Sequence, residues 1–259
     1  MKYSSLTDLI EKMKSSPRVK GIFTTGTTAS RLTQSSDIDL VVVIDKNNEG
    51  IKLVYTTIEK RFSDIFFFDI DFLNHVKNKQ EVFCNNFDGM FLEWLVKGKI
   101  EYDPENLLSA LKDKLSKNSP IQKVPDSEKK DFWVKVNYNY IANLRYYSGD
   151  DLYKKALEMR LLYSVSELIS AYFSFRDISW RGEKAAVKYL EENDPGFLSI
   201  FDAYSKGNSL EDKMKHYEDL FGKIFFGEYQ KWDNDFVIPV STKNQYDPKL
   251  RLFWDQLAG

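Results

Sequence analysis

The stretch from Asp37 to Ile44 reads D-I-D-L-V-V-V-I, two carboxylates at alternate positions followed by an unbroken apolar run. Such a run, apolar on both faces, is typical of an inner strand that helices cover on both sides. Residues two apart on a strand share a face, so we expect Asp37 and Asp39 to point the same way, about 7 Å apart. The chain therefore has to build a helix-covered sheet with two like charges at the mouth of a buried strand.

Two carboxylates held side by side indicate a bound cation. Oxygen ligands suit Mg²⁺, which proteins usually hold through one or two carboxylates together with substrate phosphates. One or two such ions can support the in-line transfer of a phosphoryl or nucleotidyl group. We therefore expect Asp37 and Asp39 to be metal ligands and catalytic residues for a transfer from a nucleoside triphosphate.

Gly26 and Thr27 follow an apolar segment and precede these carboxylates by about ten residues. A glycine after a strand allows a ligand to approach the backbone closely, and the amides and hydroxyl that follow can bind phosphate oxygens. We expect Gly26 and Thr27 to hold the triphosphate while the aspartates hold its metal.

The remaining periodicity predicts an α/β (α+β) fold with a small mixed sheet in the first half and helices in the second. The segment 117–127 carries two prolines and no periodicity, so we place a domain boundary there, between a catalytic domain at 1–118 and a helical domain at 128–259. The predicted strands are 19–24, 37–44, 64–68 and 99–102; the predicted helices are 5–16, 50–62, 71–79, 88–97, one starting at 103–105, 128–148, 151–175, 181–193 and 209–232.

The run G26-T27-T28-A29, six further residues, then S36-D37-I38-D39-L40 resembles the signature of the polymerase-β-like nucleotidyltransferase superfamily. In that signature Gly-Ser is followed by Asp-h-Asp or Asp-h-Glu, where h is apolar. Thr27 stands here in place of the commoner serine and keeps the hydroxyl. The resemblance implies that the carboxylates hold catalytic metal, and it makes Arg31 in the same loop a nucleotide-binding candidate.

The resemblance also implies a third metal-binding carboxylate on the next strand. Asp64, Asp69 and Asp71 are the candidates. Asp64 begins the strand S-D-I-F-F-F and is similar in placement to the acid of antibiotic nucleotidyltransferases, whereas Asp69 fits a turn or a helix start. We favour Asp64 as the third catalytic and metal-binding residue, and Asp69 stays open.

Two later segments extend the resemblance. Residues 98–104, G-K-I-E-Y-D-P, resemble the segment that closes the catalytic domain in aminoglycoside and lincosamide nucleotidyltransferases, and 140–156 look like the helical domain of streptomycin-type adenylyltransferases. A helical domain of this kind would supply the acceptor site and basic side chains for the triphosphate. Arg145, Lys155 and Lys184 are possible, and Lys155 is our candidate. Some relatives take their general base from it, and Glu158 and Glu167 are both open for that role.

Composition excludes several partner classes. Lys plus Arg at 37 against Asp plus Glu at 39 leaves a net charge of −2, which offers no track for a long nucleic acid. Cys84 is alone, so no internal disulfide forms. No stretch reaches the ~18 consecutive apolar residues of a membrane span, and the N-terminal segment is not patterned as a signal peptide. We expect a cytoplasmic protein with no membrane partner.

The leading hypothesis is a Mg²⁺-dependent nucleotidyltransferase that moves a nucleoside monophosphate, AMP from ATP, onto a hydroxyl of a small molecule and releases pyrophosphate. An aminoglycoside or lincosamide acceptor, and hence antibiotic resistance, is its most concrete form. The alternatives are a protein-modifying transferase of the toxin–antitoxin type and a non-catalytic nucleotide-binding regulator with the same fold.

Overall fold

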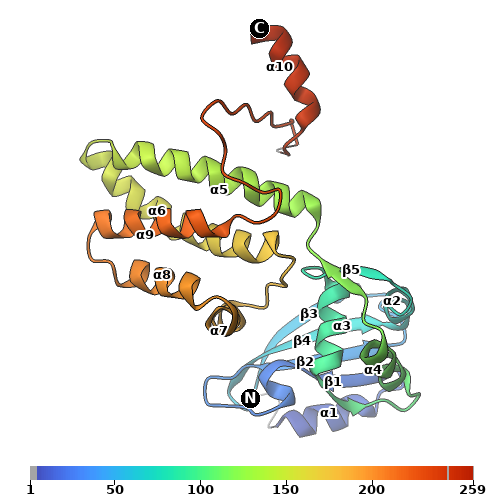
Figure 1. The fold of residues 1–259 in the computed structure, drawn as a ribbon. Coiled ribbons are helices and arrows are strands. Elements are labelled where there is room, and N and C mark those ends of the chain that lie inside the picture. Colours follow the sequence, from blue (N-terminus) through green and yellow to red (C-terminus); the bar gives the residue numbers. More distant parts are fainter. Residues whose placement is uncertain (1–4, 244, 259) are drawn as a thin grey trace. The chain divides into compact units, whose positions relative to one another are not determined.

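The chain folds into two compact units, which divide between residues 122 and 123. The computed structural model describes residues 5–243 and 245–258. The first unit contains a mixed β-sheet with helices, and the second is helical, as Figure 1 shows. The predicted fold class is confirmed.

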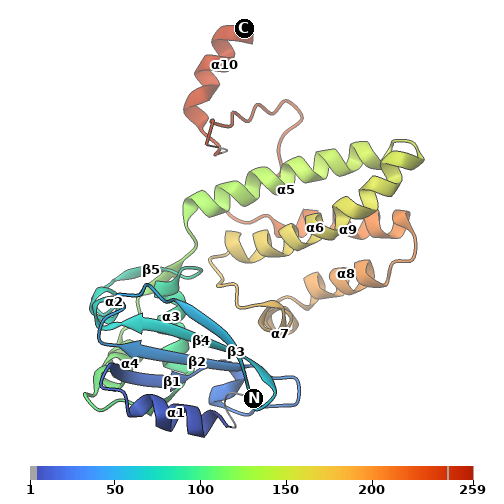
Figure 2. The ribbon, with the colours of Figure 1, turned by 180° about the vertical axis from the view of Figure 1, so that it is seen from behind.

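The five-stranded sheet of the first unit has the order β3-β4-β2-β1-β6. Figure 2 shows β4, β2 and β1 side by side. β2 and β4 are parallel, and all other neighbours are antiparallel. The central strand β2 is buried on both faces apart from Asp39, as its apolar run predicts. The strands are β1 (Val19–Thr24), β2 (Ile38–Ile44), β3 (Leu53–Ile58), β4 (Arg61–Asp69) and β6 (Lys99–Tyr102).

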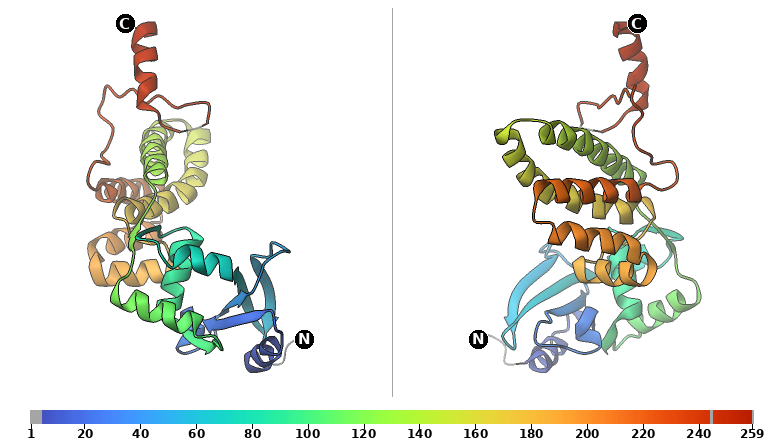
Figure 3. Two further views of the ribbon diagram at one scale, coloured as in Figure 1. Left: turned by 90° about the vertical axis from the view of Figure 1, so that its right-hand side faces the viewer. Right: turned by 60° about the vertical axis from the view of Figure 1, so that its left-hand side comes forward.

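Helices cover both faces of this sheet (Figure 3). α1 (Leu6–Lys14) packs on one face, where Leu9 and Ile10 meet the even-numbered residues of β2. The other face, which carries Val41 and Val43, packs against α2 (Ile70–Val76), α3 (Phe87–Lys97) and α4 (Leu107–Lys117). Asp39 shares this second face, because it lies two residues before Val41.

The helix predicted for residues 50–62 is wrong. The segment forms β3 and the start of β4, joined by a tight turn at Glu59 and Lys60, whose φ angles are 52° and 64°. Two-residue hairpin turns with positive φ are ordinarily marked by Asn-Gly or Asp-Gly, and Glu-Lys carries no such signal. The apolar spacing therefore predicts a helix, although the β-branched Val54 and Ile58 suit a strand.

The second unit is built on two long antiparallel helices, and α6 packs against both α5 and α9. α6 matches the predicted helix 151–175, and the Asp150 side chain caps it by accepting from the amides of Leu152 and Tyr153. The helices of the second unit are α5 (Asp126–Tyr147), α6 (Asp151–Phe175), α7 (Glu183–Asn193), α8 (Pro195–Lys206), α9 (Leu210–Ile224) and α10 (Arg251–Ala258), with the 3-10 turn η2 (Pro248–Leu250) before α10.

Several short elements were not predicted. α8 lies between the predicted helices 181–193 and 209–232, and it begins at Pro195 because proline is suited to the first turn of a helix. α9 ends at Ile224 rather than at 232. β5 (Glu81–Phe83) and β7 (Ile121–Lys123) pair in a separate small sheet. None of the helices within residues 5–243 and 245–258 combines the length and apolarity needed to cross a membrane.

Candidate active site

Asp39 and Asp64 are direct neighbours across the sheet. They are paired residues of the parallel strands β2 and β4, so their backbones are one strand spacing apart, about 4.8 Å. Paired residues of neighbouring strands project from the same face, and here it is the face that α2, α3 and α4 cover farther along the strands. The strand pairing thus places two carboxylates side by side although they are 25 residues apart in sequence.

Asp37 lies one residue before β2 and completes the acidic group. Burial raises the pKa of Asp64, and the negative charge of Asp37 raises it further. Oδ1 of Asp64 is buried and has no hydrogen-bond partner among the described residues. An ionised carboxylate in this setting is poorly solvated and is repelled by its neighbour, which is the environment that a cation relieves.

Gly26 begins the short 3-10 turn η1 (Gly26–Ala29), which follows β1. Its φ of +58° lies in the left-handed region that favours glycine. A Cβ at this position would lie 2.6 Å from Oδ2 of Asp39. The predicted phosphate loop therefore touches a predicted metal ligand directly.

Thr27 and Thr28 stand next to each other but have different surroundings. The hydroxyl of Thr28 accepts from the backbone amide of Asp39 at 2.9 Å and lies 3.4 Å from the carbonyl of Asp37, to which it donates. Oγ1 of Thr27 is buried and has no partner among the residues that the structure describes. Thr28 thus fixes the backbone of both aspartates, and the Thr27 hydroxyl is left for a ligand.

Arg61 holds the loop that leads into Asp37. Its guanidinium donates to the carbonyl of Ser36 at 3.1 Å and to that of Thr33. A hydrogen bond within the loop also stabilises it, because the Oγ of Ser36 accepts from the amide of Thr33 at 2.9 Å. Because Arg61 starts β4 three residues before Asp64, one strand both carries Asp64 and anchors the segment before Asp37.

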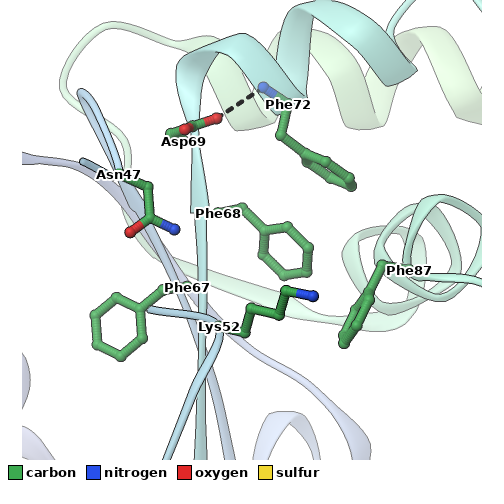
Figure 4. Close-up of a pocket in the computed structure, with 7 residues that line it drawn as sticks. All are labelled: Asn47, Lys52, Phe67, Phe68, Asp69, Phe72 and Phe87. Atoms are coloured by element: carbon green, nitrogen blue, oxygen red, sulfur yellow. Dashed lines mark hydrogen bonds between the residues drawn. The ribbon is translucent and has the colours of Figure 1, made fainter. Parts of the chain in front are cut away.

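Asp69 lies at the opposite end of β4, paired with Ile44. Its Oδ1 accepts from the amide of Phe72 at 2.9 Å and caps α2. Asp69 lines a pocket of about 190 Å³ together with Asn47, Lys52, Phe67, Phe68, Phe72 and Phe87 (Figure 4). Asp69 serves the helix start, and Asp71 lies in the first turn of the same helix.

The remaining predicted residues are Arg31 in the first unit and three residues of α6 in the second unit, Lys155, Glu158 and Glu167. Arg31 is exposed in the loop between η1 and β2, and Lys155 is exposed on α6 in the second unit. Glu158 forms an ion pair with Lys213 at 2.9 Å. Glu167 accepts a hydrogen bond from Asn139, and burial raises its pKa against the opposing effect of Lys135.

Sequence patterns did not single out Thr28 or Arg61. Thr28 follows a threonine that the resemblance already explained, so its separate contacts gave no signal. Arg61 fell in the segment predicted as a helix, where an arginine reads as a surface charge. Both residues act through hydrogen bonds to backbone groups, which only the folded chain reveals.

Within the described parts of the chain, no three His, Cys, Asp or Glu side chains converge closely enough to hold a metal ion by themselves. A carboxylate pair is nevertheless sufficient for Mg²⁺ when substrate phosphates complete its coordination. The unpartnered Oδ1 of Asp64 and the oxygen-only donors of the paired Asp39 and Asp64 fit such an ion.

No protein-family model matches this chain, and no curated protein matches its sequence. Among solved structures, it is similar to a nucleotidyltransferase-like protein from Exiguobacterium sibiricum, with 14% sequence identity over 84% of this chain and 76% of that one, at a TM-score of 0.38. This is a distant structural similarity. A likeness of this degree does not define an activity, so function has to be argued from the side chains.

Proposed function

We propose that the chain is a metal-dependent nucleotidyltransferase, which moves a nucleoside monophosphate from a triphosphate, ATP in our proposal, to a hydroxyl of a small molecule. The observation that carries this proposal is the pairing of Asp39 with Asp64, whose Oδ1 is buried and has no partner among the described residues. Both residues are partly buried, and two adjacent carboxylates that are partly shielded from water repel each other unless a cation lies between them.

The proposal assigns a role to each group. Asp37, Asp39 and Asp64 would hold Mg²⁺, which supplies charge stabilisation at the reacting phosphate. The Thr27 hydroxyl donates to a phosphate oxygen, and Gly26 leaves the space that the Asp39 carboxylate occupies. Thr28 and Arg61 hold the backbone of the aspartates in place. Arg31 and Lys155 remain predicted contacts of the triphosphate.

The transfer balances as a displacement at the α-phosphorus. The acceptor hydroxyl oxygen bonds to that phosphorus, and the bond from it to the oxygen bridging to the β-phosphate breaks. Pyrophosphate leaves with the electron pair. The hydroxyl proton passes to a carboxylate beside the attacking oxygen, and Asp64 is our candidate for it.

The test is pyrophosphate release from ATP, CTP, GTP and UTP, each with and without Mg²⁺, against a panel of hydroxyl compounds that includes aminoglycosides and lincosamides. We expect release that requires Mg²⁺ and an acceptor, and that is lost in Asp39→Asn. Asp69→Asn is the matched control, since asparagine can still cap α2. Nucleotide binding without any release would identify a regulator rather than a transferase, and absence of nucleotide binding would contradict the proposal altogether.

A further inference from the structure

The face that carries the carboxylates continues onto the edge strand β3. Tyr55 of β3 is paired with Asp64, which is itself paired with Asp39, so the three residues form one row across three strands. Directly paired residues share a face. Tyr55 therefore projects from the same side of the sheet as the two carboxylates.

Phe62 joins Tyr55 on this face. It lies two residues before Asp64 on β4, so it shares the face of that carboxylate. The rings of Tyr55 and Phe62 stack with their centroids 5.7 Å apart and their planes at 25°. The side chains are 65% and 58% exposed, although two neighbouring aromatic rings are costly to leave in water.

The order of strands places this aromatic pair relative to the carboxylates and to the Gly26–Thr27 loop. The Gly26–Thr27 loop follows β1, the carboxylates lie on β2 and β4, and the rings lie on β3 and β4. The triphosphate loop and the rings thus lie on opposite sides of the carboxylates. In a displacement at phosphorus, the attacking and leaving oxygens are roughly in line on opposite sides of the reacting atom.

We infer that the Tyr55–Phe62 pair is the acceptor platform, and that the acceptor carries its reactive hydroxyl on or beside a ring with an apolar face, such as an aromatic ring or a sugar. This inference rests on the proposed function. If pyrophosphate leaves toward the Gly26–Thr27 loop, the hydroxyl attacks from the Asp64 side, where the rings are. The nucleoside, which leaves the α-phosphorus at an angle to this line, does not occupy the same position.

A ring explains the observed surface better than an acyclic alcohol does. Two exposed aromatic faces provide offset stacking, which strengthens binding by about 0.5–1.5 kcal/mol per ring pair, or about two- to tenfold in affinity. Asp64 lies beside the platform, one strand away from Tyr55, and reaches a hydroxyl on the edge of a stacked ring. The pair thus selects the acceptor by shape and sets its hydroxyl toward the carboxylates.

The experiment compares ring-bearing and acyclic probes on the full chain. The ring probes are methyl, benzyl and 4-nitrophenyl β-D-glucoside, and the acyclic probes are glycerol, erythritol and sorbitol. Binding is measured by saturation-transfer NMR with Mg²⁺ and a non-hydrolysable ATP analogue present, and transfer is measured as pyrophosphate release with Mg²⁺ and ATP. We expect the ring probes, and not the acyclic ones, to bind and to stimulate release.

The variants are the double substitution Tyr55→Ala with Phe62→Ala, and Tyr55→Phe, which keeps the ring. Phe83→Ala is the control, because Phe83 is an exposed aromatic of the same unit on β5. We expect the double variant to bind the ring probes more weakly and to have a KM for them about fivefold higher or more. Its affinity for the ATP analogue should be unchanged. Tyr55→Phe and Phe83→Ala should resemble the wild type.

Three results would overturn the inference while leaving the proposed function intact: ring probes that bind the double variant as well as the wild type, acyclic probes that serve equally well, or a double variant that loses the ATP analogue instead. The last result would assign the rings to the nucleobase. A wild-type chain that binds no nucleotide would contradict the proposed function itself, and the platform with it.

Discussion

Gly26 and Asp39 are in such close contact that a Cβ on the glycine would lie 2.6 Å from Oδ2 of the aspartate. No real Cβ contact is that short, so any side chain at Gly26 must displace the carboxylate. The conformation of the loop after β1 and the position of the Asp39 carboxylate on β2 therefore depend on each other.

Gly26→Ala should abolish nucleotidyl transfer. The new methyl group pushes the Asp39 carboxylate out of place, and the positive φ adds about 1–2 kcal/mol of strain. Gly50→Ala is a matched control, since Gly50 has a φ of +63° and open space around its missing Cβ. Both variants should lose similar stability in urea, and only Gly26→Ala should lose pyrophosphate release. Equal activity in the two variants would separate Gly26 from the site.

Asp37→Asn, Asp39→Asn and Asp64→Asn should each reduce turnover on the order of a thousandfold, because each removes charge from the proposed metal site at little change in volume. Asp69→Ala should keep turnover and lose about 1 kcal/mol of stability, since it removes the cap of α2. Steady-state kinetics and urea unfolding of the four variants measure both effects. An inactive Asp69→Ala together with an active Asp64→Asn would contradict the assignment of the third carboxylate.

Asp64→Asn should stabilise the metal-free protein at neutral pH. The pKa of Asp64 is raised above its ordinary value of 3.8, so the folded chain binds the proton more tightly than the unfolded chain does. Stability from this group is complete below that value and is lost as the pH rises through the folded pKa. The amide removes this loss, so the melting temperature in EDTA should rise at pH 7.

The same gain should shrink as the pH falls below 3.8, where the carboxyl becomes protonated in both states. Mg²⁺ with the ATP analogue should raise the melting temperature of the wild type more than that of Asp64→Asn, because a ligand stabilises only the state that binds it. A variant that melts below the wild type at pH 7 in EDTA would show that the ionised carboxylate is well accommodated by the protein alone.

Thr27→Ala should change nucleotide affinity but not stability, whereas Thr28→Ala should change stability as well as turnover. The hydroxyl of Thr27 has no partner among the described residues, so its loss should leave stability unchanged and weaken nucleotide binding by about 1.5–3 kcal/mol, the range of a hydrogen bond to a charged group. Thr28→Ala removes the contacts to Asp39 and Asp37, so it should lower both stability and turnover. Isothermal titration with the ATP analogue and urea unfolding separate the two effects. A destabilised Thr27→Ala with normal affinity would contradict the ligand role of that hydroxyl.

Much of the framework could be predicted from sequence because it depends on short-range patterns. The apolar run of 41–44 determines an inner strand wherever it is placed, and Asp150 with the periodicity after it determines where α6 begins. The nearness of Gly26, Thr27 and Asp39 was likewise predictable, because β1 and β2 are consecutive strands that pair directly.

The tertiary structure decided the features that depend on pairing between distant segments. The register of β2 on β4 decides that Asp64, and not Asp69, lies beside Asp39. A register is a property of two hydrogen-bonded strands together, so neither strand's sequence determines it alone. The β3–β4 hairpin, with Tyr55 beside Asp64, forms because that ladder gains a further strand, although its turn carries no glycine or asparagine. Whether a hydroxyl has a partner, as for Thr28 but not Thr27, follows only from where the folded backbone brings its amides and carbonyls.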